Sequence, residues 1–173
     1  MKLIFLDVDG VLNSLSTKAE IEGYTFVSDE LVALLKQIVD ATDAKIVLSS
    51  TWRRGWYCKE HVANPDAQDL QDIRMFDSLE AKLRDFGIEL MSYTDDFGKR
   101  GQEIDVWLKA WQGEPIESYV ILDDMGGAEI RPHSRYLVQT SLGGGMNTKH
   151  AARAIKLLNA SQKPSESPES FET

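Results

Sequence analysis

The stretch Leu3-Ile4-Phe5-Leu6-Asp7-Val8-Asp9-Gly10 decides which fold this chain is expected to adopt. Its apolar half predicts a buried strand. Its acidic half follows where that strand ends, and the carboxyl ends of parallel strands are where α/β proteins bind ligands. Asp7 and Asp9 would repel one another there, and a hard cation such as Mg²⁺, which is bound by carboxylate oxygens, would relieve the repulsion. Taken alone, the motif also fits an ordinary acidic turn.

Three further segments carry polar residues beside predicted elements. They are Ile46–Leu48 followed by Ser49, Ser50 and Thr51, then Lys99 and Arg100 before a helical pattern, and Tyr119–Leu122 followed by Asp123 and Asp124. Along the chain, the order is therefore an acidic pair, hydroxyl groups, a basic pair and a second acidic pair.

Strand and helix patterns alternate along the chain. Predicted strands cover 2–7, 45–48, 88–91, 119–122 and 136–138. One predicted helix begins near Ser28, and three more cover 78–86, 101–111 and 148–158. Strands separated by helices indicate βαβ units. We therefore predict an α/β fold, a Rossmann-like three-layer sandwich with a mostly parallel sheet. Residues 161–173 are rich in Ser, Glu and Pro, which predicts a disordered tail.

The composition is that of one ordinary globular domain. The chain has 173 residues, of which 42% are apolar and 27% charged, and a net charge of -9. Such a chain has no general electrostatic attraction to nucleic acid or to an anionic membrane. No apolar stretch reaches membrane-spanning length, and we expect no signal peptide before the first strand. With Cys58 as the single cysteine, we expect a cytoplasmic protein. We also expect no membrane association and no obligate protein partner.

The four motifs together resemble the haloacid dehalogenase (HAD) superfamily of aspartate-nucleophile phosphatases, over about residues 1–160. The residues of these motifs are similar to those of the small HAD domains of Swiss-Army-knife-type RNA repair proteins, in the segments Asp7–Val11, Leu48–Arg53, Arg100–Leu108 and Val120–Asp124. The resemblance implies one HAD-like hydrolase domain over 1–160. It also implies Mg²⁺-dependent hydrolysis of a phosphomonoester through an aspartyl-phosphate intermediate.

The spacing of the motifs limits the accessory structure. In the superfamily, cap domains are inserted after the first strand or between the second and fourth. The gap from Asp7 to Ser49 has room for one helix and a short flap. The later gap already holds a predicted helix and strand, which leaves residues 52–76 as a small lid. We therefore expect a nearly capless enzyme with an open site.

The resemblance assigns roles to the four acidic residues. Asp7 would be the nucleophile, since a carboxylate can attack phosphorus and split hydrolysis into two easier steps. Asp9 would protonate the leaving oxygen and then help to deprotonate the attacking water. Mg²⁺ would be bound by the carboxylates of Asp7 and Asp124 and by the main-chain carbonyl of Asp9. Asp123 would bind the ion through water or orient its neighbours.

The phosphate-binding residues are less uniquely defined. Ser49 directly follows its strand and is expected to hydrogen-bond a phosphoryl oxygen, with Ser50 and Thr51 one or two positions away. A serine there also fits a helix cap. A cation must offset charge on the transferred phosphoryl group. The superfamily usually has Lys at that position, and the narrower resemblance favours Arg100 over Lys99.

An aromatic and basic cluster follows the hydroxyl motif. It consists of Trp52, Arg53, Arg54, Trp56 and Tyr57. On a lid facing the site, aromatic rings could stack bases and arginines could meet phosphates of a single-stranded nucleic-acid end. The alternative is a packed lid with solvated arginines.

The expected partner is therefore a phosphorylated substrate. The resemblance favours the phosphate end of a polynucleotide, whereas the acidic net charge argues against nucleic acid. The rival interpretations are a phosphate-binding or phospho-receiver-like regulatory module without turnover, and a non-catalytic scaffold. Receivers place the phosphorylated Asp on a middle strand, and no catalytic position is visibly lost here.

Overall fold

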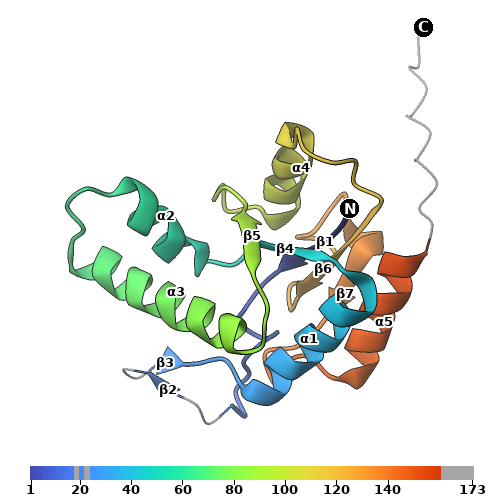
Figure 1. Ribbon diagram of the computed structural model, residues 1–173, viewed down its shortest axis with the longest axis horizontal. Coiled ribbons are helices and arrows are strands. Elements are labelled where there is room, and N and C mark those ends of the chain that lie inside the picture. The colour runs from blue at the N-terminus through green and yellow to red at the C-terminus, as the bar shows by residue number, and fades with distance from the viewer. Residues whose placement is uncertain (18–19, 22–23, 161–173) are drawn as a thin grey trace, which may run out of the picture.

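The computed structural model describes residues 1–17, 20–21 and 24–160. The predicted disordered tail, 161–173, lies outside the described residues. Within them, a five-stranded sheet carries helices on both faces (Figure 1). The predicted α/β fold is confirmed.

All strand pairs in the large sheet are parallel, in the order β5-β4-β1-β6-β7. The strands are β1 (Lys2–Leu6), β4 (Lys45–Leu48), β5 (Leu90–Tyr93), β6 (Ser118–Asp123) and β7 (Leu137–Gln139). A separate antiparallel pair is formed by β2 (Glu20–Ile21) and β3 (Tyr24–Thr25). The predicted strands are confirmed, with the third displaced toward its carboxyl end and the fifth starting one residue later.

The register of the central strands aligns the sequence motifs. Leu6 of β1 is level with Leu48 of β4 and Leu122 of β6. The amide of Asp7 donates to the carbonyl of Leu122 at 2.9 Å, and that of Ser49 donates to the carbonyl of Leu6 at 2.8 Å. Three motifs far apart in the sequence therefore meet at one sheet edge.

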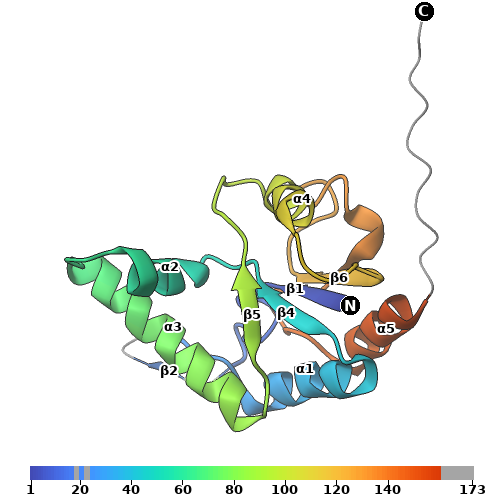
Figure 2. The same cartoon turned by 45° about the horizontal axis from the view of Figure 1, so that its top comes forward.

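Alternation along β1 divides the core into two layers. Ile4 and Leu6 pack with residues of α1, α3 and α5, whereas Leu3 and Phe5 pack with residues of α4. The helices are α1 (Asp29–Thr42), α2 (Arg53–His61), α3 (Ala67–Asp85), α4 (Arg100–Ala110) and α5 (Thr148–Asn159), with a 3-10 turn at Ser134–Tyr136. Figure 2 shows α4 on one side of the sheet and α1 and α5 on the other. Both faces are covered, which explains the unbroken apolar run in β1.

The segment predicted to be a small lid, 52–76, consists of α2 and the first half of α3. The helix predicted to start at Ser78 begins eleven residues earlier, at Ala67. Asp66 caps it, because its side chain accepts hydrogen bonds from the amides of Gln68 and Asp69. Helices α2 and α3 pack closely: a Cβ atom on Gly55 would lie 2.1 Å from the carbonyl oxygen of Asp72.

No helix within the described part of the chain combines the length and the apolar character that crossing a bilayer requires.

Candidate active site

Three carboxylates meet at the sheet edge beyond β1 and β6. Oxygens of Asp7, Asp123 and Asp124 all lie within 4.8 Å of one another. Asp7 is 7% exposed and Asp123 is completely buried. Burial and the nearby Asp123 carboxylate raise the pKa of Asp7 to about 7. Burial likewise raises the pKa of Asp123. Two buried carboxylates and one half-buried carboxylate that repel one another fit a hard divalent cation such as Mg²⁺.

Gly10 allows this cluster to close. Its φ angle is +72°, which L side chains rarely adopt, and a Cβ atom there would lie 2.7 Å from Oδ2 of Asp124. The carbonyl of Gly10 accepts a hydrogen bond of 2.6 Å from the hydroxyl of Thr140, after β7. The turn after Asp9 therefore lies against Asp124 and is held by a hydrogen bond from Thr140.

The structure places Arg100, and not Lys99, among the carboxylates. Arg100 Nη2 lies 3.5 Å from Asp7 Oδ1, and Arg100 Nε lies 3.2 Å from Asp123 Oδ2. Both contacts are within ion-pair range. Lys99 is the exposed residue that precedes α4. The guanidinium thus stands where positive charge can offset both the acidic cluster and a bound phosphoryl group.

Arg53, expected on a substrate-facing lid, is instead buried in an ion-pair network. Arg53 Nη2 lies 3.1 Å from Oε2 of Glu103 and 3.1 Å from Oδ1 of Asp96. Its Nη1 donates to the carbonyl of Ser50 at 3.0 Å. Burial lowers the pKa of Arg53, and Glu103 partly opposes that shift. Glu103 also lies 3.9 Å from Arg100, so it joins two buried guanidinium groups.

Asp9 is exposed, and two side chains hold its carboxylate. Trp52 Nε1 donates to Asp9 Oδ2 at 2.9 Å, and Asn13 Nδ2 donates to Asp9 Oδ1 at 2.7 Å. The oxygen of Asn13 in turn accepts from the amide of Gly10 at 3.0 Å. Of the predicted aromatic and basic cluster, Trp52 is therefore in direct contact with a predicted catalytic residue. The sequence analysis did not identify Asn13 or Glu103.

The two serines after β4 occupy different environments. Both are completely buried. A hydrogen bond from the Ser50 side chain helps to lower the pKa of Asp7 against the larger effect of burial. The hydroxyl of Ser49 has no hydrogen-bond partner among the described residues. Ser50 therefore contacts the predicted nucleophile, whereas the unpartnered Ser49 hydroxyl is shielded from solvent. Thr51 is exposed.

The remaining aromatic and basic residues lie along α2. Trp56 stacks on Phe76 with 5.2 Å between ring centroids, and its Nε1 donates to Glu60 at 2.7 Å. Tyr57 lies against His61. Arg54 pairs with carboxylates of α3 and lines a pocket that also includes Asp9. The structure thus brings Trp52 and Arg54 toward Asp9 and directs Trp56 into the packing between helices.

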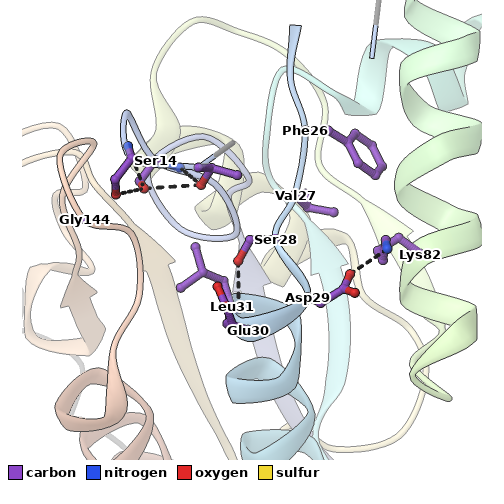
Figure 3. A pocket seen from close by; sticks show the side chains of 11 residues that line it. Ser14, Phe26, Val27, Ser28, Asp29, Glu30, Leu31, Lys82 and Gly144 are labelled. Carbon is purple, nitrogen blue, oxygen red and sulfur yellow. Dashed lines mark hydrogen bonds and ion pairs between the residues drawn. The ribbon is translucent and has the colours of Figure 1, made fainter. Parts of the chain in front are cut away.

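A larger pocket, of about 840 Å³, lies elsewhere, between the loop after Asp9 and the start of α1 (Figure 3). Its polar groups pair with one another: Lys82 Nζ lies 2.6 Å from Asp29 Oδ1, and Ser28 Oγ accepts from the amide of Leu31 at 3.2 Å. None of the residues that line it belongs to the four sequence motifs. The candidate active site is therefore at the clustered carboxylates and Arg100, and not at this pocket, although the pocket is larger than the one that includes Asp9.

Comparison with known proteins gives one match. The model of the family described as "HAD domain in Swiss Army Knife RNA repair proteins" matches residues 3–151. No curated protein and no solved structure matches the chain. The matched segment covers most of the chain and includes all four motifs, and it confirms the resemblance seen in the sequence. This chain therefore belongs to the family of HAD domains of Swiss Army Knife RNA repair proteins.

Proposed function

We propose that this protein is a Mg²⁺-dependent phosphomonoester hydrolase that works through an aspartyl-phosphate on Asp7. The observation that carries the proposal is the position of Asp7, buried between the Arg100 guanidinium and the Asp123 carboxylate. A nucleophile for phosphorus needs a cation beside the transferred phosphoryl group, and Arg100 supplies one.

Carboxylates and a main-chain carbonyl would hold the metal ion. Asp7, Asp124 and the carbonyl of Asp9 would be ligands, and Asp123 would bind through water or fix its neighbours. When bound, Mg²⁺ would neutralise part of the negative charge of the carboxylates and the phosphate. Asp123 is already near Arg100 and accepts a hydrogen bond of 2.9 Å from the amide of Met125, which suits an orienting role.

The reaction would proceed in two steps. In the first, an oxygen of Asp7 forms a bond to phosphorus, the bond from phosphorus to the leaving oxygen breaks, and Asp9 gives that oxygen a proton. In the second, water attacks phosphorus, Asp9 takes a proton from it, and the bond between Asp7 and phosphorus breaks. Arg100 faces the transferred group throughout, and Ser49 or Ser50 would donate a hydrogen bond to it.

For the substrate, we propose the phosphate end of a polynucleotide. The description of the family supports this, because it names RNA repair. An exposed Asp9 also supports it, since a large substrate can reach an exposed general acid. Cys58, the single cysteine, fits a reducing compartment such as the cytoplasm.

The test is hydrolysis of p-nitrophenyl phosphate with Mg²⁺, with EDTA, and with Mg²⁺ restored. We expect turnover that EDTA abolishes and Mg²⁺ recovers, and no turnover by Asp7→Asn. Oligonucleotides phosphorylated at the 3′ or 5′ end then test the substrate. Metal-dependent phosphorylation of Asp7 by acetyl phosphate without release of phosphate would instead favour the phospho-receiver-like module. Turnover by Asp7→Asn would contradict the covalent mechanism.

A further inference from the structure

A pocket of about 270 Å³ opens beside Asp9. Besides Asp9, its walls are formed by Thr51 and Trp52 before α2, Arg54 on α2, and Gln68, Asp72 and Met75 on α3. The close approach of the two helices at Gly55 fixes the positions of these walls relative to each other. The pocket is therefore formed by two packed helices together with the turns that follow β1 and β4.

The position of Asp9 indicates which part of the substrate would enter this pocket. Trp52 and Asn13 each hold one oxygen of the Asp9 carboxylate, at 2.9 Å and 2.7 Å. In the proposed reaction, Asp9 protonates the leaving oxygen, so the alcohol part of the substrate extends from that residue. The pocket opens beside Asp9, so it offers a space that the alcohol part can enter.

The charge of Arg54 is balanced within the protein. Arg54 Nε lies 2.8 Å from Asp72 Oδ2, and Arg54 Nη2 lies 3.4 Å from Asp69 Oδ1. Gln68 Nε2 donates to the other oxygen of Asp72 at 3.0 Å. With Asp9 included, one guanidinium stands against three carboxylates. A second phosphate of a substrate would thus meet a surplus of negative charge there.

The other lining groups suit an uncharged ligand. Gln68 and Thr51 offer an amide and a hydroxyl group for hydrogen bonds, and Met75 offers an apolar surface. The volume lies just below the range of about 300–1,000 Å³ that is typical of ligand pockets. There is thus room for one ring-containing residue and not for several.

We propose that this pocket binds the single uncharged residue that carries the phosphate, a sugar or a nucleoside, and that substrate recognition ends with that residue. The inference rests on the proposed phosphatase activity and narrows it. At the end of a polynucleotide, the pocket would hold only the terminal residue, and Arg54 would not contact the next phosphate.

The experiment compares three substrates: acetyl phosphate, a nucleoside monophosphate, and an oligonucleotide that ends in the same phosphorylated nucleotide. For the unmutated protein with Mg²⁺, we expect kcat/KM on the nucleotide and the oligonucleotide to agree within about threefold. We also expect kcat/KM on the oligonucleotide to depend only weakly on salt, because phosphate contacts are what make binding salt-dependent.

A pocket-filling variant tests the site itself. In Gln68→Trp, the ratio of kcat/KM on the nucleotide to kcat/KM on acetyl phosphate should fall by at least about tenfold, because a filled pocket rejects the ring. Gln71→Trp is the matched control: it places the same change on the same helix, outside the pocket, and should leave the ratio unchanged.

Three results would overturn the proposal. The first is an unchanged ratio in Gln68→Trp. The second is an oligonucleotide preferred by more than about tenfold, with a steep salt dependence that Arg54→Ala removes. The third is no Mg²⁺-dependent hydrolysis of any of the three substrates by the unmutated protein, and only this third result would also contradict the proposed function.

Discussion

Glu103 and Arg53 form a buried ion pair, with 3.1 Å between Oε2 and Nη2, that joins α4 to α2 at the edge of the sheet. Glu103 also accepts a hydrogen bond of 3.0 Å from the amide of Phe97. Through its contact with Arg100, this carboxylate helps to position the Arg100 guanidinium beside Asp7. One buried side chain therefore connects the stability of the fold to the geometry of the site.

Replacement of Glu103 by Gln should affect stability and turnover together. Two buried guanidinium groups would lose a shared counter-charge, and removal of one partner of a buried pair costs about 3–5 kcal/mol. We expect urea unfolding to show a loss of about 3 kcal/mol and kcat on p-nitrophenyl phosphate to fall with little change in KM. Glu114→Gln, at an exposed position, is the control. A Glu103→Gln protein as stable as the unmutated one would show that the pair does not contribute to folding.

Replacement of Asp7 by Asn should stabilise the metal-free protein at pH 8. The folded-state pKa of Asp7 is about 7 against a reference value of 3.8, so at pH 8 the fold carries the full cost of burying this charge. Below pH 7 the folded carboxyl becomes protonated while the unfolded one stays ionised down to about pH 4. The advantage of Asp7→Asn should therefore shrink as the pH falls from 8 to 5. Thermal unfolding in EDTA measures it, and an advantage that grows toward low pH contradicts the assignment.

Asp124 should contribute more to metal affinity than Asp123. The Asp123 carboxylate already has Arg100 and the amide of Met125 as partners, and it is completely buried. Asp124 is half-buried and has no ion pair among the described residues, so its charge remains available to the metal. We expect calorimetric titration with Mg²⁺ to show a larger rise in Kd for Asp124→Asn than for Asp123→Asn. The opposite order would place the ligand one residue earlier.

Replacement of Trp52 by Phe should weaken the general acid. It removes the indole N–H that holds Asp9 and keeps most of the ring that packs near Phe26. We expect kcat to fall about tenfold on an alkyl phosphate, because misplacement of a catalytic group is costly, and less on p-nitrophenyl phosphate, whose leaving group needs little protonation. Trp56→Phe is the control, since its N–H bonds to Glu60 away from the site. Equal losses on both substrates would argue against a role through Asp9.

The fold and the order of the motifs could be predicted because they depend on local patterns. In each motif, the apolar run of the strand and the polar residues that follow it lie within a few positions of one another, and the register of β1, β4 and β6 then brings the motifs together. Arg100 could be chosen over Lys99 only through the family resemblance. The structure adds a geometric reason, because α4 begins at Arg100 and directs its side chain to Asp7.

The misplacement of Arg53 depends on contacts between distant segments. Arg53 stands beside exposed Arg54 in the sequence, and nothing local indicates that Asp96 and Glu103 bury one of the two. The start of α3 at Ala67, by contrast, has local signals that the sequence analysis did not use: a capping box between Asp66 and Asp69, and Leu70, Ile73 and Phe76 at helical spacing.

The strand order also determines when the site can exist during protein synthesis. β1 leaves the ribosome first, but its neighbour β6 and the acidic pair Asp123 and Asp124 follow more than a hundred residues later. At about 5–20 residues per second, the β6 side of β1 stays unpaired for roughly 6–20 s. During that interval Asp7 has no acidic partner from β6, so a nascent chain cannot assemble the carboxylate cluster. An exposed apolar strand edge is a target for aggregation and for chaperones, and here that exposure precedes any metal site that could stabilise the fold.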